Sequence, residues 1–283
     1  MSDPMTSSTK TGIAVTGATG QLGGRVARRL AARGTAQHLL VRDPARAPDL
    51  PGATVGRAGF TDGDAVRHAL DGVPVVFMVS ATESRDRVEQ HRAFVDAAAA
   101  AGVGHLVYVS FAGAAPDATF THARDHWHTE QHIRASGLSF TFLRDNLYAD
   151  FLPGLAGADG VIRGPAGDGR VAAVAQDDIA EAATVVLTDP AAHAGRTYDL
   201  TGPEALSLHE IAALLSATYE PETVAQAYRS RASYGAESWL VDAWVSTYTA
   251  IAAGELATVS DAVPRLTGHP ATSFAELLAR LNR

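Results

Sequence analysis

Three glycines spaced three residues apart are the first feature of this sequence that indicates chemistry. Gly17, Gly20 and Gly23 follow the apolar residues 13–16 and open a segment with helical periodicity, residues 21–33. Glycines in such a turn let phosphate groups approach the backbone, and the free N–H groups of the helix attract their charge. The spacing predicts a dinucleotide site, although a turn that only packs helix against strand is the alternative. The predicted contacts come from Gly17, Ala18, Thr19, Gly20, Gln21, Leu22 and Gly23.

Two arginines indicate which dinucleotide is bound. The second apolar run, residues 38–41, ends in Arg42, and Arg46 follows about one turn later. An acidic residue here would favour NAD, whereas guanidinium groups suit the 2′-phosphate of NADP. We therefore predict NADPH or NADP as the cofactor, with NAD less favoured. The alternative is that Asp43 contacts the ribose and that both arginines are solvated.

The ends of the next two predicted strands supply further candidate contacts. Ligands of a parallel sheet lie at the carboxyl ends of its strands. We therefore expect Gly59 and Phe60 near the adenine, and Val79, Ser80 and Ala81 near the nicotinamide. Phe60 is equally well explained as a core residue.

Residue types that are missing exclude several kinds of catalysis. The chain has no cysteine, and its only lysine is Lys10. Disulfides, thiolate catalysis and a catalytic lysine in the body of the protein are therefore excluded. Four histidines fall into two pairs spaced i, i+4, but the pairs point about 120° apart around a helix, so we predict no metal site. These histidines are His122, His126, His128 and His132.

The elements that must position these residues alternate along the chain. Apolar runs at residues 13–16, 38–41, 53–56, 75–79, 105–110 and 139–144 are separated by segments with helical periodicity. This alternation predicts an α/β fold, a Rossmann-type doubly wound parallel sheet, with a smaller and mainly helical C-terminal substrate domain. We expect a disordered tail at residues 1–10 and a nucleotide-binding domain at 11–150, to which 176–200 return. The substrate part would comprise residues 151–175 and 201–283, including a helix over 207–219 capped by Ser207 and Glu210.

Several motifs together resemble those of a known family. They are the loop at residues 16–24, the strand end and turn at 41–46, and the segments 135–148, 198–203 and 266–270. The chain resembles the NmrA-like atypical short-chain dehydrogenases, and among them the members that reduce quinones and triphenylmethane dyes with NADPH. That resemblance also implies a histidine in the site at the position of His126. It implies further cofactor contacts from Thr82, Glu83, Tyr108 and Asn146.

The residues that would do the chemistry differ from those of typical short-chain dehydrogenases. Those enzymes use Tyr-x-x-x-Lys, whereas the corresponding positions here are His122 and His126. A quinone or a dye cation accepts hydride without an enzymic acid, so the protein mainly has to align donor and acceptor. His126 could bind the nicotinamide ribose or the substrate oxygen, or act as an acid. Tyr148 is the candidate substitute proton donor.

These observations favour an NADPH-dependent oxidoreductase that passes hydride to a quinone-like or other electron-poor aromatic acceptor. Two alternatives remain, a non-catalytic sensor of NADP(H) with a protein partner and a natural-product reductase that uses His122 or His126 as its acid. The predicted substrate pocket contains Ser110, Phe111, Trp127, Tyr148 and Phe151.

Charge and hydropathy bear on partners and location. The net charge of −8 disfavours direct binding of nucleic acid, and no apolar run approaches the roughly 20 residues that span a membrane. The polar N-terminus lacks the apolar stretch of a signal peptide, so we expect a cytoplasmic protein. Trp239, Trp244 and Tyr248 could close the cleft or form the contact of a homodimer.

Overall fold

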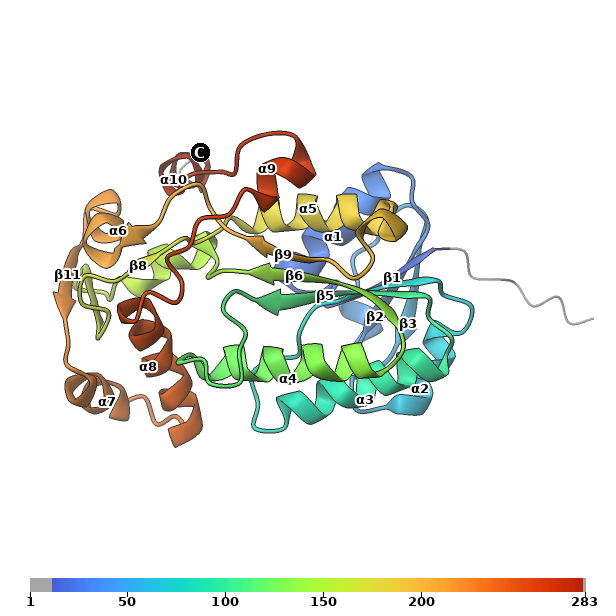
Figure 1. Ribbon diagram of the computed structural model, residues 1–283, viewed down its shortest axis with the longest axis horizontal. Coiled ribbons are helices and arrows are strands. Elements are labelled where there is room, and N and C mark those ends of the chain that lie inside the picture. Colours follow the sequence, from blue (N-terminus) through green and yellow to red (C-terminus); the bar gives the residue numbers. More distant parts are fainter. Residues whose placement is uncertain (1–11, 282–283) are drawn as a thin grey trace, which may run out of the picture.

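A seven-stranded parallel sheet forms the centre of residues 12–281, the part of the chain that the computed structural model describes (Figure 1). The strand order is β3-β2-β1-β4-β5-β6-β9, so the direction of winding reverses between β1 and β4. This order confirms the predicted α/β Rossmann fold, whose ligands lie at such a reversal. The expected tail at residues 1–10 lies outside the described residues. The strands are β1 (Ile13–Thr16), β2 (Gln37–Val41), β3 (Ala53–Arg57), β4 (Val75–Met78), β5 (His105–Phe111), β6 (Ser139–Asp145) and β9 (Thr197–Leu200).

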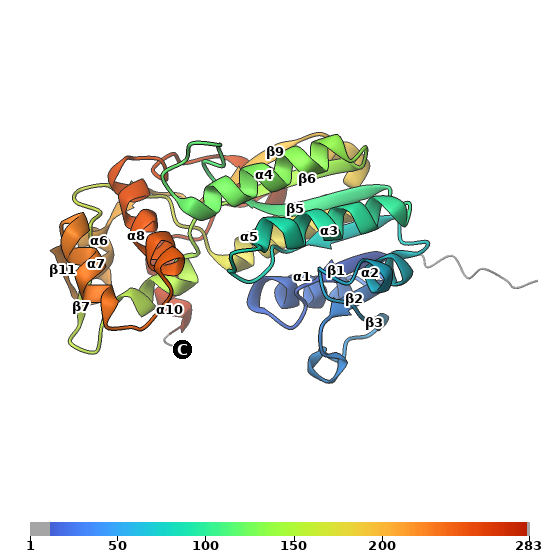
Figure 2. The ribbon, with the colours of Figure 1, turned by 90° about the horizontal axis from the view of Figure 1, so that it is seen from below.

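Helices cover both faces of the sheet, as Figures 1 and 2 show. One layer contains α1 (Gln21–Ala32) and α5 (Gln176–Thr188), and the other contains α2 (Gly63–Leu70), α3 (Arg87–Ala100) and α4 (Thr121–Ala135). Successive side chains of a strand point to opposite faces, so apolar runs such as β1 and β4 can bury both sides. In β1, Ile13 and Val15 pack in the cluster with α1 and α5, and Ala14 packs in the cluster with α2 and α3.

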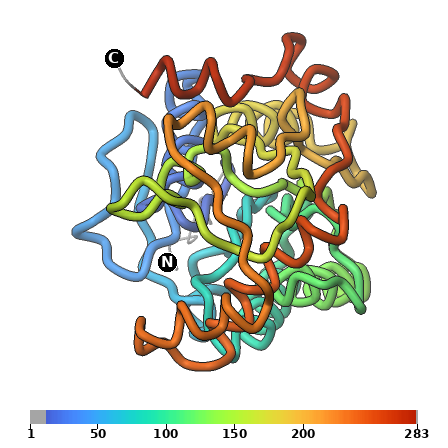
Figure 3. Tube along the Cα trace, turned by 90° about the vertical axis from the view of Figure 1, so that its left-hand side faces the viewer, coloured from blue at the N-terminus to red at the C-terminus, as the bar shows by residue number. Residues whose placement is uncertain are grey.

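The C-terminal part lies beyond the carboxyl ends of β5 and β6 (Figure 1). Figure 3 views the molecule from this end, with the yellow-green and orange segments in front of the sheet. Short strands tie distant segments together, because β7 (Val161–Gly164) pairs with β11 (Thr218–Pro221) and β8 (Arg170–Val171) pairs with β10 (Leu206–Ser207). The helices of this part are α6 (Leu208–Leu214), α7 (Val224–Ala232), α8 (Ser238–Ala252) and α10 (Phe274–Leu281), whereas α9 (Ala262–Thr267) lies beside α5. Short 3-10 turns of the chain are η1 (Pro44–Arg46), η2 (Ala149–Leu155) and η3 (Pro190–His193).

The helix expected over residues 207–219 is shorter than predicted. Its start is correct, since Ser207 and Glu210 form the capping box. The helix ends at Leu214, however, and Ser216 takes the left-handed conformation at φ 55°, from which a helix cannot continue. Residues Thr218–Pro221 then form β11, and the buried hydroxyl of Tyr219 donates a hydrogen bond to the Gly164 carbonyl at 2.8 Å.

Residues 262–271 return to the sheet. Ala262, Val263 and Ala271 belong to the same buried cluster as Val15 and Leu30, next to α5. None of the helices in residues 12–281 combines the length and apolar character needed to cross a membrane. The predicted boundaries of a separate substrate part remain a prediction.

Candidate functional site

The glycine loop between β1 and α1 has a conformation that depends on its glycines. Gly17 has φ +66°, and its carbonyl accepts a hydrogen bond from the Gly20 N–H at 2.9 Å. A Cβ atom on Gly23 would collide with the carbonyl oxygens of Gly17 and Thr16. Within the described residues no side chain caps α1, so its first N–H groups remain available to an anion. The loop therefore fits a pyrophosphate.

A polar cavity of about 300 Å³ opens beside this loop. Its walls come from the ends of β1, β2, β3 and β4, where the sequence places the dinucleotide. Arg42 lines it, whereas the predicted contacts Arg46 and Gly59 are not part of its lining. Asp43 caps η1 by accepting a hydrogen bond from Ala45 N at 3.1 Å. This bond favours a structural role of Asp43 in the turn over the alternative that Asp43 contacts the ribose. The lining residues are Gly17, Thr19, Leu40, Val41, Arg42, Ala58, Phe60, Val79, Ser80, Ala81, Thr82, Glu83, Ser84 and Gln90.

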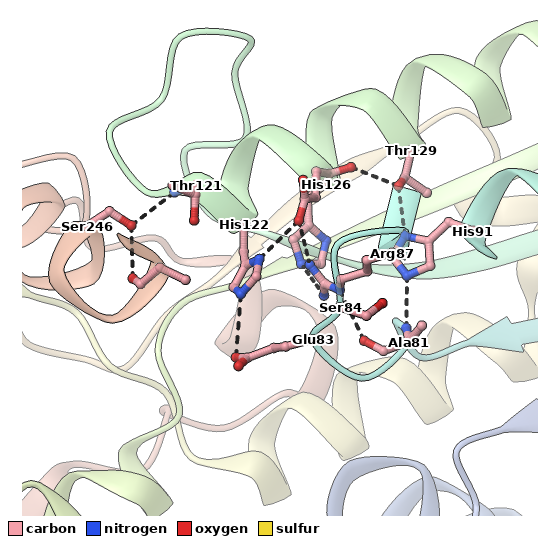
Figure 4. Close-up of polar contacts among 12 residues, drawn as sticks. Ala81, Glu83, Ser84, Arg87, His91, Thr121, His122, His126, Thr129 and Ser246 are labelled. Carbon is pink, nitrogen blue, oxygen red and sulfur yellow. Dashed lines mark hydrogen bonds and ion pairs between the residues drawn. The ribbon is translucent and has the colours of Figure 1, made fainter. Parts of the chain in front are cut away.

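The segment after β4 is fixed by buried side chains behind it (Figure 4). Val79 N donates to Thr16 Oγ1 at 2.8 Å, and Ala81 N donates to His91 Nε2 at 2.9 Å. Arg87 Nε donates to the Ala81 carbonyl at 3.1 Å. Both Arg87 and His91 are missing from the sequence-based site. The sequence pattern that could have identified them is a charged residue and a histidine four positions apart, which lie on the same face of α3 as its buried apolar residues.

His126 lies at the centre of this network. The guanidinium of Arg87 can only donate, so Nε2 of His126 accepts its hydrogen bond at 3.1 Å and Nδ1–H donates to the Tyr108 hydroxyl at 2.8 Å. Burial, together with the charge of Arg87, lowers the pKa of His126 well below its usual value. The ring is therefore neutral with both nitrogens engaged, which argues against an imidazolium acid.

The other histidines of α4 have separate partners. Nδ1 of His122 lies 3.0 Å from Asp125 Oδ2, and its Nε2 lies 3.6 Å from Glu83 Oε1 (Figure 4). His132 pairs with Asp96 at 2.7 Å. Within residues 12–281 there is no group of three or more potential ligand side chains around one point for a metal.

The side chains of two predicted cofactor contacts are buried and do not line the polar cavity. Tyr108 is fully buried under His126, and burial raises the pKa of its hydroxyl. Asn146 is also buried. Its Nδ2 donates to the Leu256 carbonyl at 3.0 Å, and its Oδ1 accepts from Leu147 N at 2.8 Å. Asn146 therefore holds the chain after β6 in place.

Three residues predicted for the substrate pocket do not line the larger cavity in the C-terminal part. Ser110 is fully buried, and its hydroxyl donates to Glu130 Oε1 at 2.6 Å. Phe111 packs in the core with its ring 5.0 Å from that of Phe120. Trp127 is not on the buried side of α4 and packs beside His128. The direction of each side chain, which the sequence pattern left open, explains these three positions.

A larger cavity of about 520 Å³ lies in the C-terminal part, and Tyr148 and Phe151 are in its wall. We call it the aromatic cavity, because Tyr234, Trp244 and Tyr248 also line it. The other residues of its lining are Leu147, Leu152, Gly154, Leu155, Gly157, Val161, Arg163, Val171, Leu208, Ser230, Arg231, Thr247 and Ile251.

Three buried polar atoms of side chains that contact the cavity walls have no hydrogen-bond partner within the described residues, although two of them have ion-pair contacts at 3.6 Å. They are Arg87 Nη1, His122 Nε2 and Asp145 Oδ2. His122 approaches Glu83 of the polar cavity, and the side chain of Asp145 interacts with that of Tyr148 in the wall of the aromatic cavity. Buried polar atoms normally have partners, so these three fit a polar ligand group that binds between the cavities. The nicotinamide end of a dinucleotide carries suitable donors and acceptors.

Comparisons with known proteins agree with this geometry. A family model described as the NmrA-like family matches residues 9–229. Quinone oxidoreductase 2 of Escherichia coli is 35% identical over 282 residues, which cover 95% of this chain and 98% of that protein. The NAD(P)H azoreductase of Xenophilus azovorans is 35% identical over 275 residues, 93% of this chain and 96% of that protein.

Solved structures of such proteins have the same fold. The NADPH complex of the Escherichia coli quinone oxidoreductase superposes with a TM-score of 0.86 at 33% identity, covering 96% of this chain and all (100%) of that one. The Citrobacter triphenylmethane reductase complexed with NADP(H) gives a TM-score of 0.84 at 30% identity, covering 95% of this chain and 99% of that one. The similarity therefore extends over both cavities.

Proposed function

The chain belongs to the NmrA-like family and is an NAD(P)H-dependent oxidoreductase, and from this premise we propose that it passes hydride from NADPH to a quinone-like, electron-poor aromatic acceptor. One observation carries the proposal. The polar cavity and the aromatic cavity are linked through the side chains that carry the three unpartnered polar atoms. Arg87 and His122 contact Ala81 and Glu83 of the polar cavity, and Asp145 interacts with Tyr148 of the aromatic cavity. A cofactor in the first cavity and a flat acceptor in the second would meet there.

The residues of the polar cavity suit NADPH. When bound, this cofactor supplies hydride from its nicotinamide ring. Gly17, Gly20 and the start of α1 would hold the pyrophosphate, and Arg42 would bind the 2′-phosphate. Val79–Glu83 would line the nicotinamide half, because Arg87 and His91 fix this segment from behind. Arg46 and Gly59 remain predicted contacts at the rim.

The aromatic cavity suits a flat, conjugated acceptor. Rings such as those of Phe151, Trp244 and Tyr248 can pack against its faces and exclude water. The names of the relatives support this class, since quinones, azo compounds and triphenylmethane dyes are all electron-poor conjugated molecules. Tyr148 is part of the wall, and we propose that its hydroxyl group contacts the acceptor. For His126 we propose a positioning role through Arg87, and for His122 a contact with bound ligand through Nε2.

Stopped-flow loss of nicotinamide absorbance tests the proposal. NADPH is mixed with the protein and a panel of a quinone, an azo compound and a cationic triarylmethane dye, with NADH as the matched donor. We expect rapid oxidation of NADPH with at least one acceptor and weaker use of NADH. Tight binding of NADPH without oxidation by any acceptor would contradict the proposal and favour the sensor alternative. A rate that depends on protonation of His126 would favour the natural-product reductase.

Two further expectations concern the setting of the enzyme. We propose a homodimer, and light scattering at micromolar concentration measures its mass. A monomer at all concentrations would rule this out. The cytoplasmic location also stays a prediction, which fractionation of cells that express the full chain can test.

A further inference from the structure

A buried carboxyl group lies beside the aromatic cavity without a role in hydride transfer. We infer that Asp145 supplies, through the hydroxyl of Tyr148, the proton that a quinone-like acceptor needs after it has taken hydride. The inference rests on the proposed function and adds a catalytic pair to it. Asp145 is the last residue of β6, and its neighbours across the sheet are Phe111 and Leu200. Neither neighbour offers a charge or a side-chain hydrogen bond.

A second buried aspartate shows what is unusual about Asp145. Asp178 is 4% exposed, and its two oxygens accept hydrogen bonds from the Thr272 hydroxyl at 2.9 Å and the Thr272 N–H at 2.6 Å. Asp145 is 3% exposed, yet its Oδ2 has no hydrogen-bond partner within residues 12–281. A buried carboxylate needs such donors, whereas a neutral carboxyl group costs much less to bury. The surroundings of Asp145 therefore favour the form that carries a proton.

The electrostatics of the pair agree with this geometry. Burial raises the pKa of Asp145 well above its usual value, and the hydrogen bond from Tyr148 and the charge of Arg87 only partly oppose it. The charged groups that act on Tyr148 are Asp145, Arg87 and Asp150. Burial and Asp145 raise the pKa of Tyr148 well above its usual value, so this hydroxyl gives up a proton only when another replaces it.

The proton transfer balances without any further reactant. Hydride addition leaves a negative charge on one oxygen of the quinone. A new O–H bond forms there as the O–H bond of Tyr148 breaks, and Tyr148 takes the proton of the Asp145 carboxyl. The Asp145 carboxylate is left within the field of Arg87 and recovers a proton from solvent after the product leaves. No electron moves in this relay, and NADPH remains the only reductant.

Two acceptors with different proton needs test the relay. A quinone needs a proton after hydride addition, whereas a cationic triarylmethane dye becomes neutral with hydride alone. General acid catalysis contributes about 10²–10⁴-fold, so in Asp145→Asn the ratio of the quinone rate to the dye rate should fall about a hundredfold. Tyr148→Phe should lower the ratio similarly, and the control Asp178→Asn should leave it as in the wild type. An unchanged ratio in Asp145→Asn would overturn the inference.

An infrared measurement gives a readout that needs no acceptor. The spectrum of the wild type minus that of Asp145→Asn at pH 7 should contain the C=O band of a protonated carboxyl group. Asp178→Asn should lack that difference band, because burial raises the pKa of Asp178 but its two hydrogen bonds from Thr272 oppose that rise. If the band is missing for Asp145, the proton source is refuted even when quinone reduction is observed. If the band is present but no acceptor oxidises NADPH, the proposed function fails and the relay with it.

Discussion

The polar cavity is formed by short segments that each follow a strand, whereas the aromatic cavity is formed by side chains scattered over residues 147–251. Backbone geometry shapes the first, because Gly17 and Gly23 admit no side chain. The second depends on rings such as Trp244 and Tyr248 that distant helices bring together. Recognition of the cofactor is thus a local property of the chain, and recognition of the acceptor is a tertiary one. Substitutions in the polar cavity should therefore change cofactor binding, and substitutions in the aromatic cavity should change acceptor binding.

A buried arginine in each region allows the strongest test of this separation. Arg87 is 6% exposed and forms an ion pair with Asp125 at 3.6 Å, and Arg231 is 8% exposed with Glu222 at 2.9 Å. Breaking a buried ion pair destabilises a protein by about 3–5 kcal/mol, so Arg87→Met and Arg231→Met should each lower the free energy of unfolding by about 3 kcal/mol. Only Arg87→Met should also weaken NADPH binding. Urea unfolding and fluorescence titration measure the two effects, and equal loss of NADPH binding in both variants would contradict the separation.

Low pH should destabilise the segment that forms the wall of the polar cavity, and it should not destabilise the aromatic cavity. Burial, with the charge of Arg87, lowers the pKa of His91 to about 3, so the unfolded chain, with a histidine pKa of about 6.5, takes up the proton first. The stabilisation is complete above pH 6.5 and is lost as the pH falls toward 3, at about 1.4 kcal/mol per pH unit. His91→Gln should remove this part of the slope in urea unfolding between pH 7 and 5. No histidine lines the aromatic cavity within the described residues. An unchanged slope in His91→Gln would refute the assignment.

The choice of cofactor should depend on one exposed arginine. Arg42 lines the polar cavity, and Arg46 in η1 does not. A hydrogen bond to a charged group contributes about 1.5 kcal/mol or more, so Arg42→Ser should raise the Kd for NADPH at least about tenfold. The Kd for NADH should not change. Arg46→Ser is the matched control and should have the smaller effect, and a larger effect of Arg46→Ser would place the 2′-phosphate elsewhere.

The substitution of one aromatic ring in the aromatic cavity should have the smallest effect of these changes. Trp244→Leu removes one aromatic face while it keeps an apolar side chain. Aromatic contacts contribute about 0.5–1.5 kcal/mol, so the KM for a quinone should rise about two- to tenfold. The Kd for NADPH should stay at the wild-type value in the same preparation. A change in the Kd for NADPH alone would show that the two cavities are not independent.

Local patterns in the sequence were sufficient for the sheet and the glycine loop. Alternating apolar and helical segments predicted the strands from β1 to β6, because buried parallel strands are continuous apolar runs. The strand β11 was missed because its partner β7 is far away in the sequence, and no short pattern records such a pairing. The helix start at Ser207 was predicted because its capping box is local.

The polar network could not be predicted in the same way. Arg87, His91 and Asp145 are of residue types that usually face solvent, and only the packed structure shows that they are buried. Conversely, Ser110 and Asn146 stood at the correct strand ends but bond to Glu130 and to the Leu256 carbonyl. A sequence pattern locates a strand end well, but it does not fix the neighbours of each side chain there.

The contact of α9 with α5 has a consequence for synthesis on the ribosome. The cluster that covers one face of the sheet contains Val15 near the start of the chain and Ala271 near its end. The sheet strands are complete at residue 200, but that face still lacks part of its cover until residue 271 has emerged. At roughly 5–20 residues per second this delay lasts several seconds. During that time the nascent sheet presents an apolar strip that chaperones can bind.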